Sequence, residues 1–155
     1  MRIKRIHHLT IAVRDAEQAR ETFEALFSSA SDEPREIDAF GVRTRDVAIG
    51  DDVLQLAAPR GPGSPIMRFL ERKGEGFYNL ALEVDDLDAA VAELGERGIK
   101  VSEPIEATPG VRSAFVTMAA THGLSIQLVE TVETAEAVEA KTPLDLTPDE
   151  WSDDG

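Results

Sequence analysis

The sequence predicts an α+β fold of two βαβββ modules, whose curved mixed sheets form a shared cleft. The main observation is an internal repeat, in which residues 6–15 recur 71 residues later as residues 77–86. Two shorter segments repeat in the same order, residues 41–44 as 110–113 and residues 53–56 as 125–128. Because these offsets (71, 69 and 72 residues) are nearly equal, one supersecondary unit has been repeated as a whole.

The first repeat begins with an alternating segment and continues with a helical pattern. Leu9, Ile11 and Val13 alternate with small or polar residues, which is typical of a strand with one buried face. Asp15 is a suitable N-cap for the helix that follows. The expected elements of this repeat are a strand at 5–13, a helix after Asp15, a loop at 28–38 with at most a short edge strand, and a hairpin of strands 41–49 and 53–58.

The second repeat follows the same plan. Its expected elements are a strand at 77–84, a helix at 87–97, a short strand at 99–103, and a hairpin of strands 111–118 and 124–130. Between the repeats, Ser64 and Pro65 form the start signal of a short helix within the linker 59–76. We therefore expect one domain over residues 1–130, made of modules 5–58 and 77–130, and an acidic tail over residues 131–155.

The composition excludes several classes of partner. The net charge of −14 and the pI of about 4.5 disfavour nucleic acid. The sequence has no cysteine, no apolar stretch of the roughly 20 residues that a membrane span needs, and no apolar N-terminal segment of the signal-peptide kind. These features favour a cytoplasmic protein without membrane contact. In the tail, Leu144, Leu146 and Trp151 either dock on a partner subunit or over the cleft, or belong to a disordered acidic segment.

Period-two geometry brings four polar side chains onto one kind of face. If Leu9, Ile11 and Val13 pack under the helix of their module, then His8 points the other way, and the same reasoning applies to the other strands. The four polar residues at repeat-related places are His8, Gln55, Asn79 and Gln127. If the two sheets curl towards each other, these four side chains converge.

These residues carry a resemblance to a known family. From about residue 6 to residue 130 the chain resembles the vicinal oxygen chelate superfamily, the glyoxalase/bleomycin-resistance fold, and within it the methylmalonyl-CoA epimerases. The matching segments are residues 6–13, 55–59, 63–66, 69–70, 73–76, 80–86 and 97–99. The resemblance implies a homodimer that binds a small-molecule substrate.

The resemblance also implies a divalent metal, such as cobalt, manganese, zinc or nickel, with two ligands from each module. The implied ligand positions are His8, Gln55, Asn79 and Gln127. The family pattern has His at the position of Asn79 and Glu at that of Gln127, and it has a carboxylate base near Thr44. These neutral replacements weaken the metal site, because a cation in a dry cleft needs anionic or strongly donating ligands.

The proposed chemistry is removal and return of a proton at a carbon next to a carbonyl, which needs a base and a group that stabilises the enolate oxygen. The candidate catalytic residues are Gln127, Thr44, Asp46 and Glu83, and the candidate substrate-binding residues are Thr10, Asn79, Arg112 and Ser113. The function that this implies is an epimerase-like isomerase or lyase acting on an acyl-CoA or a related small acid. Two alternatives stay open, a metal-free binding module of the same fold and an isomerase or lyase that uses amide hydrogen bonds in place of a metal.

Overall fold

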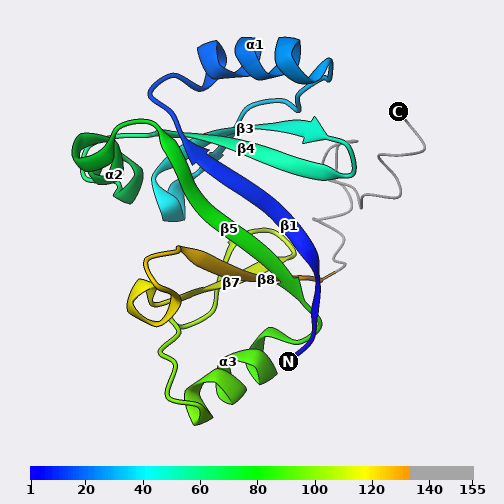
Figure 1. Cartoon of the computed structure of the whole chain (residues 1–155), viewed down its shortest axis with the longest axis vertical. Coiled ribbons are helices and arrows are strands. Elements are labelled where there is room, and N and C mark those ends of the chain that lie inside the picture. The colour runs from blue at the N-terminus through cyan, green and yellow to red at the C-terminus, as the bar shows by residue number, and fades with distance from the viewer. Residues whose placement is uncertain (133–155) are drawn as a thin grey trace. The chain divides into compact units, whose positions relative to one another are not determined.

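The computed structural model describes residues 1–132, and within them the chain forms two compact units (Figure 1). The first-repeat unit consists of residues 9–78, and the second-repeat unit consists of residues 1–8 and 79–132. Strand β1 (Ile3–Ala12) is divided between the units after His8, although the repeat assigns the whole strand to the first module. Leu144, Leu146 and Trp151, for which the sequence predicts docking or disorder, lie outside the described residues.

In the first-repeat unit the strands follow the order β2-β3-β4-β1. Strands β1 and β4 are parallel, whereas β3 pairs with β2 and β4 in antiparallel fashion. Its elements after β1 are α1 (Ala16–Phe27), β2 (Arg35–Ile37), the 3-10 turn η1 (Asp38–Phe40), β3 (Val42–Ile49), β4 (Asp52–Pro59) and α2 (Pro65–Lys73).

The helix starts of this unit follow the predicted signals. Asp15 caps α1 by accepting hydrogen bonds from the backbone N–H groups of Glu17 and Gln18. Ser64 caps α2 by accepting from the N–H of Met67, with Pro65 as the first helical residue. Gly41 is required by space as well as by its positive φ of 62°, because a Cβ atom there would lie 2.9 Å from Ser64 Cβ.

Each face of this sheet is covered by a different helix. Helix α1 lies across β3 and β4 (Figure 1) and buries the apolar residues that alternation predicts for that face, including Val13, Val47, Leu54 and Leu56. Helix α2 packs on the opposite face, where Ile66 and Leu70 contact a cluster that contains Ala12, Val42 and Ala57. The polar face of β1, β3 and β4 is therefore partly covered by the linker helix.

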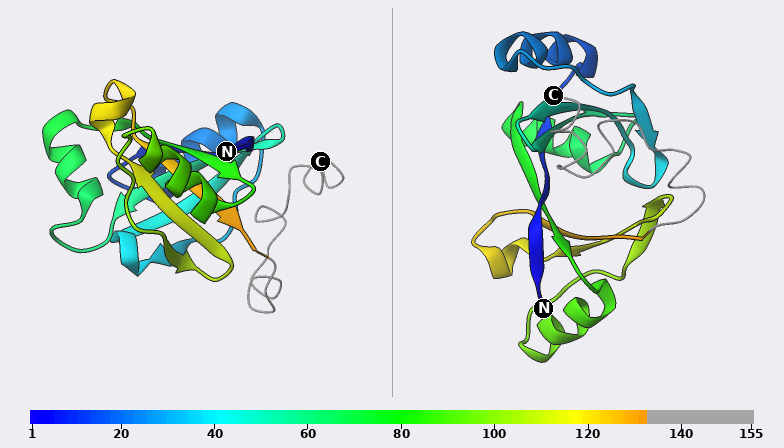
Figure 2. Two further views of the ribbon diagram at one scale, coloured as in Figure 1. Left: turned by 90° about the horizontal axis from the view of Figure 1, so that it is seen from below. Right: turned by 90° about the vertical axis from the view of Figure 1, so that its right-hand side faces the viewer.

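The second-repeat unit has the strand order β1-β5-β8-β7-β6, in which β1 contributes its residues up to His8. Strands β5 and β8 are parallel, and β7 is antiparallel to both of its neighbours. Its elements are β5 (Gly76–Val84, from Asn79 onward), α3 (Leu87–Glu96), β6 (Ile105–Thr108), β7 (Val111–Val116), the 3-10 turn η2 (Met118–Thr121) and β8 (Ile126–Thr131). Helix α3 covers β7 and β8 (Figure 2) through a core that includes Leu87, Ala114 and Leu128.

One predicted strand is misplaced. Residues 99–103 form only an isolated bridge at Val101, opposite Val116, and the short strand β6 begins at Ile105 instead. Pro104 stands between the two segments and has no N–H to donate to a ladder, so pairing stops there and resumes after it. The α+β class and the two βαβββ modules are confirmed. Within residues 1–132, no helix is both long and apolar enough to cross a membrane.

Candidate functional site

The second-repeat unit contains a network of four neutral side chains, of which three are buried and Ser125 is half-buried. Asn79 Nδ2 donates to Gln127 Oε1 at 2.8 Å, and Gln127 Nε2 donates to Ser113 Oγ at 2.9 Å. Ser125 Oγ donates to Asn79 Oδ1 at 3.1 Å. Asn79, Gln127 and Ser113 are only 3%, 7% and 2% exposed. The network therefore gives each of these side chains hydrogen-bond partners inside the protein rather than in water.

Sheet register explains why these residues meet. Ala81 of β5, Gln127 of β8 and Phe115 of β7 lie opposite one another, so they share a face. Asn79, Ser125 and Ser113 each lie two residues from one of these three, and the period of two brings them to the same face. Three of the four members were predicted as site residues. Ser125 was missed, although its place two residues before Gln127 was a usable signal.

In the first-repeat unit the equivalent hydrogen bond is a simple pair. Thr10 Oγ1 donates to Gln55 Oε1 at 3.1 Å, and these two residues lie opposite each other in the β1–β4 ladder. Gln55 belongs to a different unit from His8, Asn79 and Gln127. The convergence of all four side chains on one centre stays a prediction.

Thr44 and Asp46 lie on β3 of the same unit. Thr44 is 1% exposed, and its hydroxyl has no hydrogen-bond partner among the described residues. Asp46 lies opposite Gln55 in the ladder and forms an ion pair with Arg35 at 2.6 Å. The register thus brings Thr10, Gln55 and Asp46 to one face, with Thr44 two residues along β3.

Glu83 is a buried carboxylate of the second-repeat unit, 6% exposed. It shares the network face of the sheet, because its partner in β8 is Val129, two residues after Gln127. Its oxygens meet Arg5 Nε at 2.9 Å and Lys4 Nζ at 3.4 Å. These two cations, which sequence reasoning missed, compensate the Glu83 charge.

Arg112 lies on the opposite face of β7 from its neighbour Ser113. Its guanidinium donates to both carboxylate oxygens of Asp88 in the first turn of α3, at 3.0 and 3.1 Å. These hydrogen bonds hold the pKa of the Asp88 carboxyl below its usual range. Glu130 also pairs with Arg112 at 3.5 Å. The structure thus separates Arg112 from the polar network, and its role in substrate binding stays a prediction.

His8 is buried and lies beside His7, with 2.8 Å between their Nδ1 atoms. One imidazole of this pair donates to the other. In contrast, His122 is exposed and follows η2 in a left-handed conformation with φ of 57°. Of the three histidines, His8 therefore has the buried environment that suits a proton-transfer group or a ligand.

The donor set of the second-repeat unit does not fit the divalent metal that the resemblance implies. Both amide oxygens already accept a hydrogen bond, and neither amide carries charge. Binding a dication at these oxygens would perturb the network without supplying an anionic ligand. Within residues 1–132, no group of three or more His, Asp or Glu side chains is placed to hold a metal ion. No catalytic step is therefore assigned to a metal.

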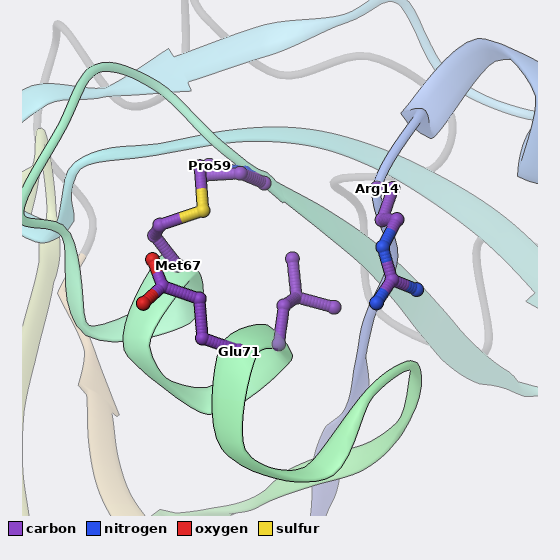
Figure 3. A pocket seen from close by; sticks show the side chains of 5 residues that line it. Arg14, Pro59, Met67 and Glu71 are labelled. Atoms are coloured by element: carbon purple, nitrogen blue, oxygen red, sulfur yellow. The ribbon is translucent and has the colours of Figure 1, made fainter.

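A pocket of about 340 Å³ lies in the first-repeat unit, beside α2 (Figure 3). Its wall is formed by Pro59, Met67, Leu70 and Glu71, with Arg14 on the far side. The Arg14 guanidinium makes no ion pair with any residue of the described chain. None of the residues predicted for the site lines this pocket. Its apolar side chains suit the apolar part of a ligand, and Arg14 and Glu71 add one charge of each sign.

Comparison with known proteins places these features in a family. The model of the Glyoxalase/Bleomycin resistance protein/Dioxygenase superfamily matches residues 7–115. The chain belongs to this superfamily. It is 33% identical over 98 residues to the mitochondrial methylmalonyl-CoA epimerase of Bos taurus. The aligned segment covers 63% of this chain and 56% of the bovine protein. The chain thus spans little more than half of that relative's length.

Solved structures of bacterial epimerases resemble the chain over most of its length. The methylmalonyl-CoA epimerase of Mycobacterium tuberculosis has a TM-score of 0.80 at 28% identity, covering 84% of this chain and 90% of that one. A Streptomyces coelicolor methylmalonyl-CoA epimerase in complex with 2-nitronate-propionyl-CoA has a TM-score of 0.80 at 29% identity, covering 86% and 99%. The predicted family is confirmed by these matches.

Proposed function

We propose that the protein is an epimerase-type isomerase that removes and returns a proton at the carbon next to the thioester carbonyl of a branched acyl-CoA, with methylmalonyl-CoA as the first substrate to test. The observation that carries this proposal is the match to the Streptomyces coelicolor epimerase in complex with an acyl-CoA analogue, which covers 86% of the chain. A shared fold alone does not define a reaction, so the proposal also depends on the polar side chains that could carry it.

The reaction needs a hydrogen-bond donor for the enolate oxygen and a group that exchanges the proton. The amide groups of Asn79 and Gln127 supply buried N–H donors. His8, Glu83 and Asp46 are the candidates for the proton-transfer groups, and all three are buried. Of these three, we assign the proton transfer to His8, because Glu83 and Asp46 are already paired with cations.

The charge of the linker that contains α2 favours a substrate with a coenzyme A group. Residues 59–76 carry four basic and two acidic side chains in a protein whose net charge is −14. Arg60 pairs with Glu36 and Asp38, whereas Arg72 and Lys73 make no ion pair among residues 1–132. Lys73 Nζ lies over the Phe69 ring, 5.8 Å from its centroid. Cations without an ion-pair partner favour the phosphate groups of coenzyme A.

The proposal is tested by deuterium exchange. Wild-type protein incubated with methylmalonyl-CoA in deuterated buffer is expected to incorporate deuterium at the α-carbon, and His8→Ala to slow incorporation by at least about 100-fold. His122→Asn is the matched control, because it changes an exposed turn histidine to a residue that also tolerates positive φ, and it should exchange like wild type. Absence of exchange across a series of branched acyl-CoAs would overturn the proposed activity.

A second experiment tests the coenzyme A contact. Arg72→Ala with Lys73→Ala is expected to raise KM for the CoA thioester about tenfold with little change in kcat, which is the signature of lost uniform binding. The truncated N-acetylcysteamine thioester lacks the phosphates and should react equally with both proteins. An equal effect on the two thioesters would exclude phosphate recognition by this helix.

The alternative function is a metal-free small-molecule-binding module. It is favoured if acyl-CoA binds by calorimetry while no deuterium is incorporated. Homodimerisation and a cytoplasmic location stay predictions. A sedimentation mass of 16.8 kDa at micromolar concentration would contradict the dimer.

A further inference from the structure

The hydrogen-bond inventory of the Asn79–Gln127 network is unbalanced towards donors. Each primary amide has two N–H donors and one oxygen with two lone pairs. One hydrogen bond ordinarily satisfies such an oxygen, whereas each buried N–H needs an acceptor of its own. Asn79 Nδ2 uses one hydrogen on Gln127, and Gln127 Nε2 uses one on Ser113. Each of these nitrogens therefore keeps one N–H for which the described residues show no acceptor, while both oxygens already accept a hydrogen bond.

This inventory does not depend on how the amides are oriented. If the oxygen and nitrogen of both Asn79 and Gln127 are exchanged together, Gln127 donates to Asn79, Ser113 donates to Gln127 and Asn79 donates to Ser125. Each oxygen again accepts one hydrogen bond, and each nitrogen again has one spare N–H. The same donor excess follows from either assignment.

Charge near the network also favours an anion. The network itself is neutral, and Glu83 on the same face is paired with both Lys4 and Arg5. This group of three charged side chains carries a net charge of +1. A dication would meet partly used carbonyl oxygens and a positive neighbour, whereas an anionic oxygen would meet buried N–H groups that need an acceptor.

We propose that the Asn79–Gln127 network is a hydrogen-bond-donor site for a carboxylate or enolate oxygen, and that it does not form half of a divalent-metal centre. The identity of the natural ligand rests on the proposed function, but the preference for an anionic oxygen does not. In the proposed reaction, the two amides would receive the oxygen on which negative charge develops.

The amide composition of the chain allows a direct test. The sequence contains one asparagine and three glutamines, Asn79, Gln18, Gln55 and Gln127, so a 15N-labelled sample has only four side-chain NH2 pairs. Asn79→Asp and Gln127→Glu each remove one pair and assign it. Gln18 is exposed on α1 and serves as the internal control.

Malonate and Mn²⁺ are the two probes. Titration with malonate is expected to shift the NH2 signals of Asn79 and Gln127 in a saturable way and to leave Gln18 unchanged. Equimolar Mn²⁺ is expected to broaden none of the four pairs selectively. Selective broadening of Asn79 and Gln127 by Mn²⁺ would overturn the inference, and so would a malonate titration that shifts neither pair.

The isosteric variant Gln127→Glu gives a second readout. It adds a negative charge to the network, so we expect malonate affinity, followed at Asn79, to fall at least tenfold. Unchanged malonate affinity in a folded variant would overturn the inference, and if the variant does not fold, the wild-type titrations decide alone. Deuterium exchange together with Mn²⁺ broadening would support the proposed function and refute this inference. Malonate shifts without exchange would do the reverse.

Discussion

Gln127 and Gln55 occupy equivalent positions on the last strands of the two repeats, but their amides are held differently. The amide oxygen of Gln127 accepts a hydrogen bond from Asn79, and its amide nitrogen donates one to Ser113. Gln55 accepts one hydrogen bond from Thr10, and its NH2 group has no acceptor in the described part of the chain. The second repeat therefore holds Gln127 in a network in which only N–H donors are left over, whereas the first repeat holds Gln55 by a single hydrogen bond.

The strand β3 extends this contrast. Thr44 is the repeat counterpart of Ser113, yet the Ser113 hydroxyl accepts from Gln127 while the Thr44 hydroxyl has no partner among residues 1–132. A buried polar group without a partner is costly, so natural proteins keep such groups mainly where a ligand or function uses them. The two repeats thus share a backbone plan but differ in how many hydrogen bonds hold the polar side chains of the equivalent face.

The largest expected effect comes from introducing metal ligands into the Asn79–Gln127 network. Asn79→His with Gln127→Glu places an imidazole and a carboxylate on two adjacent strands. Calorimetry with Co²⁺ should show affinity at least about 100-fold above wild type, since anionic and imidazole ligands suit first-row dications. Gln18→Glu adds the same charge on the exposed surface of α1 and should bind like wild type. Equal affinity for all three proteins would mean that the two strand positions do not cooperate.

The next effect concerns stability at the two glutamines. Gln127→Leu leaves Asn79 and Ser113 without their shared partner, and we expect a loss of about 2–3 kcal/mol in the free energy of unfolding. Gln55→Leu removes a single hydrogen bond and should cost about 1 kcal/mol or less. Urea denaturation of both variants measures the difference. Equal losses in free energy would contradict the difference between Gln127, which has two hydrogen-bond partners, and Gln55, which has one.

Smaller effects, opposite in sign to each other, are expected at the equivalent hydroxyl positions Thr44 and Ser113. Thr44→Val removes a buried hydroxyl that has no partner and should raise the free energy of unfolding by up to about 1 kcal/mol. Ser113→Ala removes a used hydroxyl and should lower it by about 1 kcal/mol. If Thr44→Val also slows deuterium exchange, the Thr44 hydroxyl lowers stability but serves the reaction. Destabilisation by both variants would show that Thr44 has a structural partner after all.

The smallest effect lies on the helix-covered faces, where the two repeats are alike. Asp88 of α3 pairs with Arg112, and Glu17 of α1 pairs with Arg45. Because the pKa of Asp88 is lowered in the folded protein, its contribution is present above the pKa of the unfolded chain and is lost as the pH falls through the folded value. Asp88→Asn should lower Tm by about 1–2 °C at pH 7 and by less at pH 2.5. A Tm difference between wild type and Asp88→Asn that grows on acidification would contradict this prediction. Glu17→Gln is the matched variant in the first repeat.

Local patterns in the sequence determined the fold. The repeat and the alternation of apolar residues identified both βαβββ modules and the helix-facing side of each strand, and Asp15, Ser64 and Pro65 marked the helix starts. These features depend on neighbours within one turn or on the period of a strand, so they can be read from consecutive residues. The same alternation correctly grouped Asn79 with Gln127, because strand parity is a local property.

Only the tertiary structure decided which partner each polar side chain has. Asn79 and Gln127 are 48 residues apart, and their hydrogen bond depends on the parallel register of β5 and β8, which no local signal sets. The ion pairs of Glu83 with Arg5 and of Asp46 with Arg35 likewise arise from chain segments brought together by folding. A polar residue in a sequence shows the chemistry that it offers, but whether that chemistry is already used depends on long-range packing. That is why the sequence suggested a weakened metal site and the structure shows a hydrogen-bonded network of amides and hydroxyls.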